Sequence, residues 1–316
     1  MKTIYTSDLK AGDEFINELF LLQDVTRRTT KDGRPYLLCT LRDNAGQAGA
    51  VFWNVPEYIE QWTTAGTAVL ISGRVVNYKD TIQVNITDMN PGQKADLEEL
   101  LPASLRSRDE MIGELRNYIA SVAEPWRTLL TNILLDDAFL PRYANAPAAR
   151  AMHHAYISGL LEHTLSMTKI ADLLAGHYPY VNRDLLIAGV LLHDVGKTHE
   201  YEVEGGFAIS EDGRLVGHIV RAIVMVEQAA STINFPPDKL QHLVHLIASH
   251  HGTQEWGSPT VPKTLEAILL HQIDLLDSRI QGFLDYVRGD GSDKAWTSKS
   301  SPMFNTELRR PDGMSE

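Results

Sequence analysis

Residues 185–197 read Leu-Leu-Ile-Ala-Gly-Val-Leu-Leu-His-Asp-Val-Gly-Lys, an apolar run that ends in a histidine and an aspartate. Because the run is apolar on every side, it predicts a helix buried in the core of a domain. Burial of an imidazole and a carboxylate at the end of such a helix is unfavourable unless something binds them. The stretch therefore predicts an α-helical domain with a binding site at His193 and Asp194.

Further histidines and an aspartate lie on both sides of this pair, and the gaps between successive clusters are 30, 25, 32 and 24 residues. Each gap fits one helix and one loop, so successive helices can bring their side chains to one point. Neutral imidazoles and carboxylates are ligands for divalent transition metals, and seven ligands are too many for one ion. We therefore predict a two-metal hydrolytic site, holding Mn, Fe, Co or Zn, formed by His163, His193, Asp194, His218, His250, His251 and Asp274.

Apolar neighbours distinguish these residues from the other histidines. Asp274 follows the largely apolar stretch at 267–273 and precedes Leu275-Leu276, and an unpaired carboxylate in such a stripe requires a cation. Four histidines without this combination are interpreted as satisfied core residues, namely His177, His199, His242 and His245.

The composition of the 316 residues is that of an ordinary soluble protein, with 43% hydrophobic and 22% charged residues. No apolar run reaches the roughly 18 residues of a membrane span, and residues 1–10 lack the apolar core of a signal peptide. We therefore expect no membrane partner. Cys39 is the single cysteine, which excludes an internal disulfide and favours a reducing cytoplasm.

The charge of the chain is unevenly distributed. Residues 1–95 contain 10 Lys/Arg and 11 Asp/Glu, whereas the remainder contains 19 and 30 and has a net charge of −11. Acidic proteins are usually poor nucleic-acid binders, because phosphate contacts dominate that affinity. The near-neutral first part and the positive charge of bound metals weaken this objection.

Residues 1–92 have the short segments and turn signals of a β domain. Turn residues occupy 31–34 and 43–46, and residues 56–64 predict a short helix. The predicted strands are 15–25, 37–41, 50–53, 68–76 and 81–86. Five strands with one helix before the fourth favour a closed barrel of the OB type, with another small barrel or sandwich as the alternative.

The rest of the chain predicts a polar linker at 93–108, an all-α domain at 109–288 and a polar tail at 289–316 that is loose or docked on a partner. The predicted helices are 109–122, 126–135, 154–175, 183–194, 215–232, 237–251 and 262–288. The fold class is therefore multidomain β + α, an N-terminal barrel followed by a helical domain.

In order and spacing, the seven candidate ligands resemble the H…HD…H…HH…D pattern of the HD-domain superfamily of metal phosphohydrolases. The resemblance implies a first ion at His163, His193, Asp194 and Asp274, and Asp194 would bridge to a second ion at His218, His250 and His251. One-metal members of the superfamily keep only the first four residues, so a single ion is the alternative, and the three additional histidines favour two. Two such ions activate water and polarise phosphoryl oxygens, with Asp194 as a catalytic residue.

Two residues near these ligands are candidates for substrate contact. Lys197 is predicted to be catalytic, contacting a phosphoryl oxygen or protonating the leaving oxygen, and the alternative is a lysine that stabilises a helix C-terminus. His154, like His153, lies more than two helical turns before His163, so it is assigned to the substrate rather than to the same ion.

Three stretches of sequence, at 153–164, 250–259 and 262–267, point to one family within this superfamily. Together with the N-terminal barrel they resemble the YhaM-type 3′→5′ exoribonucleases of bacteria over residues 1–290. This implies metal-dependent trimming of single-stranded RNA or DNA to 5′-mononucleotides, and the polarity rests on the resemblance alone. Gly257-Ser258-Pro259 stands where cyclic-di-GMP phosphodiesterases have Gly-Tyr-Pro, which argues against that substrate. The oligomeric state stays open, a homo-oligomer included.

Barrels of the OB type bind single strands through aromatic faces and a basic edge. The predicted substrate contacts in the barrel are Arg34, Tyr36, Trp53, Arg74, Tyr78 and Lys79. Two other functions stay open: an HD-domain nucleotidase or phosphodiesterase for a small nucleotide, with a regulatory barrel, and a non-catalytic nucleic-acid-binding protein.

Overall fold

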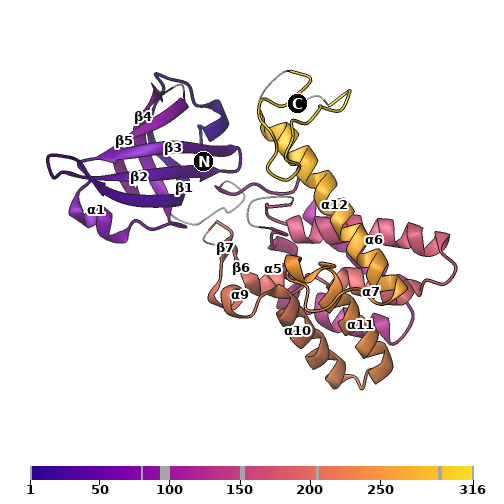
Figure 1. Cartoon of the computed structure of the whole chain (residues 1–316). Coiled ribbons are helices and arrows are strands. Elements are labelled where there is room, and N and C mark those ends of the chain that lie inside the picture. The colour runs from indigo at the N-terminus through magenta and orange to yellow at the C-terminus, as the bar shows by residue number, and fades with distance from the viewer. Residues whose placement is uncertain are drawn as a thin grey trace. The chain divides into compact units, whose positions relative to one another are not determined.

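The structure is a computed structural model that describes residues 2–79, 81–92, 100–149, 154–203, 206–290 and 294–314. It divides into two compact units, Met1–Ala103 with Glu202–Ala208, and Ser104–Tyr201 with Ile209–Glu316 (Figure 1). Of the predicted linker, residues 93–99 lie outside the described residues, and Leu100 and Leu101 are buried rather than polar and exposed.

The first unit is a closed five-stranded barrel with the strand order β1-β2-β3-β5-β4, which confirms the predicted OB-type architecture. All neighbouring strands are antiparallel except β3 and β5. Alternate side chains of β2, such as Leu37, Cys39 and Leu41, point into the barrel core. Its elements are β1 (Glu14–Thr29), β2 (Pro35–Asp43), β3 (Gly46–Trp53), α1 (Glu57–Trp62), β4 (Ala68–Tyr78) and β5 (Thr81–Pro91), after a short η1 (Thr6–Asp8).

The N-terminal segment is held to the barrel by a buried ion pair. The Lys2 ammonium lies 3.2 Å from the Asp43 carboxylate, and both side chains are fully buried. Asp43 also accepts hydrogen bonds from the backbone N–H (2.9 Å) and the hydroxyl (2.6 Å) of Thr6. The pair therefore fixes the start of the chain against the end of β2.

A segment from much later in the sequence also belongs to the barrel unit. Residues 202–208 group with it, and Phe207 is fully buried, with the Arg42 guanidinium 5.9 Å from its ring centroid. The ends of this segment belong to two short strands, β6 (Tyr201–Glu202) and β7 (Ala208–Ile209). Neither strand is predictable from the sequence, because two-residue strands have no periodic pattern.

The second unit is helical and is built around α7, the helix of the opening apolar run. All eight residues from Leu185 to Leu192 are buried, and α7 packs against α4, α6, α11 and α12. The helices are α3 (Arg108–Ser121), α4 (Trp126–Leu134), α5 (Phe139–Asn145), α6 (Gly159–His177), α7 (Arg183–Leu192), α8 (Lys197–Glu200), α9 (Glu211–Leu215), α10 (His218–Thr232), α11 (Pro237–Ser249), η3 (Gln254–Trp256) and α12 (Leu265–Gly289).

Backbone conformation corrects two of the predicted helices and adds others. The predicted helix 154–175 begins only at Gly159, because His154 and Ser158 have positive φ angles of 55° and 65°. The predicted helix 215–232 is interrupted at Gly217, whose φ of 75° ends α9 before α10 starts at His218. The short helices α5 and α8 were not predicted.

The C-terminal tail was expected to be loose or docked on a partner, and its described residues 294–314 contact α12. The Phe304 ring lies 6.1 Å from that of Phe283, and the Tyr286 hydroxyl donates to the carbonyl of Ser300 (3.0 Å). Leu308 is buried. The described residues contain no helix with the length and apolarity needed to span a membrane.

Candidate metal centre

The seven predicted ligands come together in the helical unit, although they come from five separate helices or helix ends. His163 lies on α6, His193 and Asp194 follow α7, His218 is the first residue of α10, His250 and His251 follow α11, and Asp274 lies on α12. Their donor atoms form overlapping groups within 4.8 Å of one another: His163–His193–Asp274, His193–Asp194–His250 and His218–His250–His251.

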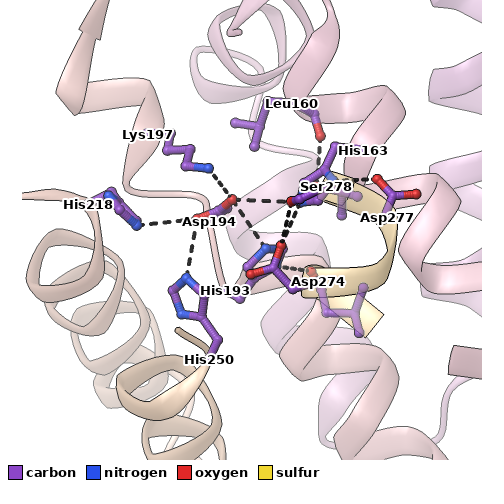
Figure 2. A network of polar contacts seen from close by, with 12 residues as sticks. Leu160, His163, His193, Asp194, Lys197, His218, His250, Asp274, Asp277 and Ser278 are labelled. Carbon is purple, nitrogen blue, oxygen red and sulfur yellow. Dashed lines mark hydrogen bonds and ion pairs between the residues drawn. The ribbon is translucent and has the colours of Figure 1, made fainter. Parts of the chain in front are cut away.

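Asp194 lies between the first and the last of these groups (Figure 2). Its Oδ2 is 3.2 Å from His193 Nε2 and 4.0 Å from His163 Nε2. Its Oδ1 is 3.6 Å from Nε2 of both His218 and His250. Each carboxylate oxygen therefore faces a different set of imidazoles, which is the arrangement of a carboxylate that bridges two ions.

All five imidazoles are oriented in the same way. In each, Nδ1 lies within hydrogen-bond distance of an acceptor oxygen, so Nδ1 carries the hydrogen and Nε2 keeps its lone pair for a metal. The acceptors are Val190 O for His193, Ile247 O for His250 and Trp256 O for His251 (each 2.8 Å), Asp277 for His163 (2.7 Å) and Glu200 for His218 (2.6 Å).

Buried polar atoms without partners test whether these residues fit a metal. Within the described part of the chain, His193 Nε2, His218 Nε2, His250 Nε2 and Asp194 Oδ1 are buried and make no hydrogen bond. Leaving such atoms unsatisfied is costly, and native proteins rarely do so without a bound group. A set of imidazole nitrogens and carboxylate oxygens is suited to divalent transition metals, so the residues fit the ions predicted for them.

The electrostatics at Asp194 and His250 favour the protonation states that metal binding requires, whereas His163 must lose a proton to a metal: burial lowers its pKa, but Asp274 and Asp277 raise it to about 9. Burial opposes ionisation of Asp194, but His193 and Lys197 hold the pKa of its carboxyl well below the ordinary value. Burial and the neighbouring His193 hold the pKa of His250 well below the ordinary value. The site thus presents an ionised carboxylate beside a neutral imidazole.

Lys197 is a cation in contact with this site. Its Nζ lies 2.6 Å from Asp194 Oδ2, and although burial opposes the charge, Asp194 raises the pKa of the ammonium. Lys197 is the first residue of the four-residue helix α8 and also lies in its last turn, so the alternative role at a helix C-terminus stays open. A protonated ammonium beside the metal ligands can contact a phosphoryl oxygen.

Family models match both units of the chain. A model of the HD domain matches residues 160–279, and a model of an OB-fold nucleic acid binding domain matches residues 24–91. The chain has an OB-fold followed by an HD domain. The HD domain indicates a metal-dependent phosphohydrolase.

Two solved structures resemble parts of the chain. The second OB-fold domain of replication protein A from Methanococcus maripaludis is 18% identical, and the match covers 30% of this chain and 99% of that one with a TM-score of 0.24. The HD domain of the L. monocytogenes phosphodiesterase PgpH is 19% identical, and the match covers 50% of this chain and 74% of that one with a TM-score of 0.30.

Most of the predicted barrel contacts lie where OB-folds bind single strands, on the β2–β3 face and in the β1–β2 and β4–β5 loops. Tyr36 and Trp53 are cross-strand neighbours whose ring centroids are 4.7 Å apart, and Trp53 is 50% exposed. Arg34 lies in the β1–β2 loop, and Lys79 lies 5.4 Å from the Tyr78 ring at the β4–β5 turn.

Arg74 differs from the other barrel candidates. It lies within β4 and its guanidinium is 3.7 Å from Glu14, a residue of the neighbouring strand β1. Its predicted contact with the substrate stays a prediction.

His154 has surroundings that the sequence did not indicate. It is buried, and its two ring nitrogens lie 2.7 Å from the Tyr156 hydroxyl and 3.1 Å from Asp277. Its predicted contact with the substrate stays a prediction. His153 lies outside the described residues. Of the histidines interpreted as core residues, His177 and His242 are in fact exposed.

Two carboxylates that contact candidate ligands, Asp277 and Glu200, were not predicted from the sequence. Asp277 lies one helical turn after Asp274, and Glu200 lies one turn after Lys197 at the end of α8. Burial opposes ionisation of Glu200, but its hydrogen bonds with His218 lower its pKa. The only sequence signal was the spacing of Asp274 and Asp277, which places both on one face of a helix.

Proposed function

We propose that this protein is a two-metal exonuclease that shortens single-stranded RNA from its 3′ end and releases 5′-mononucleotides. The observation that supports it most is Asp194, whose two oxygens face two sets of imidazole nitrogens in an HD domain attached to an OB-fold. The direction of degradation rests on the resemblance to YhaM-type exoribonucleases.

The first ion would be held by His163, His193, Asp194 and Asp274, and the second by Asp194, His218, His250 and His251. When bound, two such ions lower the pKa of a water nucleophile and polarise the phosphoryl oxygens. Mixed imidazole and carboxylate ligands suit Mn, Fe, Co or Zn.

The residues of the chain provide charge and orientation. The two aspartates offset part of the charge of two divalent cations, leaving about two positive charges that attract a phosphate. Lys197 adds a third positive charge beside Asp194 and is placed to hold a non-bridging oxygen or to donate a proton to the leaving oxygen. The backbone carbonyls of Val190 and Ile247 keep His193 and His250 in the tautomer that the ions need.

The OB-fold would hold the strand. Stacking of a base on an aromatic side chain contributes about 1–3 kcal/mol, and Tyr36 and Trp53 offer two adjacent rings on the β2–β3 face. Stacking on aromatic rings tolerates any base, as trimming of a strand requires.

The first test is a time course with 5′-labelled single-stranded RNA and Mn²⁺, with an EDTA control. The wild-type protein should produce a ladder that shortens from the 3′ end. The double variant His193→Ala/Asp194→Ala should bind the same RNA without cutting it, and cleavage that persists in this variant would contradict the proposal.

A second test separates strand trimming from hydrolysis of a small nucleotide. Tyr36→Ala/Trp53→Ala should raise KM for RNA by about tenfold or more, since each lost stacking contact is worth about 1–3 kcal/mol. Hydrolysis of bis(p-nitrophenyl) phosphate should stay unchanged. The control Tyr58→Ala removes an exposed aromatic ring from α1. If Tyr36→Ala/Trp53→Ala cleaves RNA as well as Tyr58→Ala does, hydrolysis of a small nucleotide would be the favoured function.

A further inference from the structure

A buried carboxylate lies behind the metal ligand His163. Asp277 Oδ2 is 2.7 Å from His163 Nδ1, whereas the opposite ring nitrogen, Nε2, is 3.4 Å from Asp274. Figure 2 shows Asp277 on the side of the His163 ring away from Asp194. Asp277 therefore touches a ligand without facing the space between the two sets of imidazoles.

Two further side chains hold the carboxylate of Asp277. The same Oδ2 lies 3.1 Å from His154 Nε2, and Oδ1 accepts a hydrogen bond from the Ser166 hydroxyl. Three groups from two segments of the chain thus fix one carboxylate. Asp277 itself is 8% exposed, so water does not compete strongly for these contacts.

The segment that supplies His154 is built for this contact. His154 is in the left-handed region of backbone conformation with a φ of 55°, which is unfavourable for a histidine. Its Nδ1 lies 2.7 Å from the Tyr156 hydroxyl, which donates to Glu162 (2.9 Å). A Cβ at Gly159 would lie 2.0 Å from the His154 carbonyl oxygen, so the loop can pack in this way only with glycine there.

We propose that Asp277 is the positioning residue of the first metal site. It holds His163 in the Nδ1–H tautomer, with Nε2 directed at the ion, and His154 and Ser166 hold Asp277 in place. The inference rests on the proposed two-metal function. Carboxylates that orient a ligating histidine in this way typically change metal affinity or activity by about 10–100-fold when they are removed.

A third ion among His154, His163 and Asp277 is the competing interpretation, because their donor atoms also lie within 4.8 Å of one another. The separations of 2.7 and 3.1 Å are those of direct hydrogen bonds. Ligands about 2.1 Å from a tetrahedral ion would lie about 3.4 Å apart. The geometry therefore favours a hydrogen-bonded triad.

The test is Mn²⁺ binding to the metal-stripped, full-length protein, followed by the electron paramagnetic resonance signal of free Mn²⁺. Asp277→Asn should lower the affinity of one of two sites by about 10–100-fold and leave the other unchanged. The Mn²⁺ concentration for half-maximal activity should rise by the same factor, while KM for RNA at saturating Mn²⁺ stays constant. Saturating Mn²⁺ should restore kcat, which a merely structural defect would not allow.

Glu266→Gln is the matched control. Glu266 is a buried acid on the same helix, but it accepts a hydrogen bond from the Asn182 backbone (2.7 Å) and lies outside the metal groups of the described residues. Its removal should leave Mn²⁺ affinity unchanged. If Asp277→Asn does not fold, Ser166→Ala should still reduce the affinity of the same site, by a smaller factor.

A variant pair tests whether Asp277 acts through His163. In a His163→Ala background, Asp277→Asn should change the affinity of the remaining site by less than about twofold, since the contact it supports is already gone. If Asp277→Asn binds two Mn²⁺ ions as tightly as the wild type does, the positioning role of Asp277 is overturned and the proposed two-metal function stands. Three ions in the wild type and two in the variant would support the third-ion interpretation. Wild-type protein that binds no Mn²⁺ would overturn the proposed function as well.

Discussion

Gly196, in the His-Asp-Val-Gly-Lys stretch, packs directly against the first turn of α10. A Cβ at this position would lie 2.0 Å from the carbonyl oxygen of His218 and 2.9 Å from the backbone nitrogen of Ala222. Since real Cβ contacts are not closer than 3.0 Å, α10 must move by at least 1.0 Å at His218. Gly196 has helical φ and ψ angles of −63° and −19°, so alanine meets no backbone strain and only the clash remains.

The predicted consequence of Gly196→Ala is loss of the second metal site. His218 Nε2 is 3.6 Å from Asp194 Oδ1, and metal sites tolerate errors of only about 0.2 Å in ligand distances. We expect Mn²⁺ stoichiometry to fall from two to one and kcat for RNA to fall about 100-fold or more. Overpacking should also reduce the free energy of unfolding by about 1–3 kcal/mol.

Two measurements on the same samples check this prediction for Gly196→Ala. Mass spectrometry of the metal-loaded protein counts the Mn²⁺ ions, and RNA cleavage gives kcat. Gly176→Ala is the control, because nothing lies within 4 Å of a Cβ there, and helix propensity should make that variant slightly more stable. If Gly196→Ala retained two Mn²⁺ ions and wild-type kcat, the close contact would not position His218.

Three further predictions follow from other parts of the structure. Asp43→Ala removes the carboxylate that faces the buried Lys2 ammonium, which keeps its contacts with the Leu19 carbonyl and the Phe20 ring, so urea unfolding should show a loss of about 1–3 kcal/mol, and Asp43→Asn should lose less. Glu200→Gln weakens the support of His218 and should reduce the affinity of one Mn²⁺ site by about tenfold or more in calorimetry, with KM for RNA unchanged. Burial opposes protonation of His163, but Asp274 and Asp277 raise its pKa to about 9 from 6.5. The folded state therefore binds the proton more tightly, and this stabilisation of the metal-free protein, full below pH 6.5, should be lost between pH 6.5 and 9. If the Tm of His163→Gln falls between pH 6.5 and 9 as much as the Tm of the wild type does, the loss of stability does not come from His163.

The amino-acid sequence was sufficient for the parts of this protein that depend on local patterns. The apolar run before His193 predicted a buried helix, and α7 is buried from Leu185 to Leu192. The turn signals around β2 predicted the strands of the barrel, and the closed order β1-β2-β3-β5-β4 confirms them. The order and spacing of the seven ligands identified the residues that the fold brings together, because they lie at the ends or on the inner faces of five helices.

The tertiary structure alone decided the contacts between residues that are distant in sequence. His163 and Asp277 are 114 residues apart, and the hydrogen bond between them depends on how α6 and α12 pack. Gly217 separates α9 from α10 and makes His218 the first residue of α10, a break that helical periodicity cannot reveal, since the apolar pattern continues through it. Orientation of the imidazoles likewise depends on oxygens that only the folded chain places beside each Nδ1. A sequence pattern specifies which face of an element is buried, and the packing of those faces determines which polar groups meet.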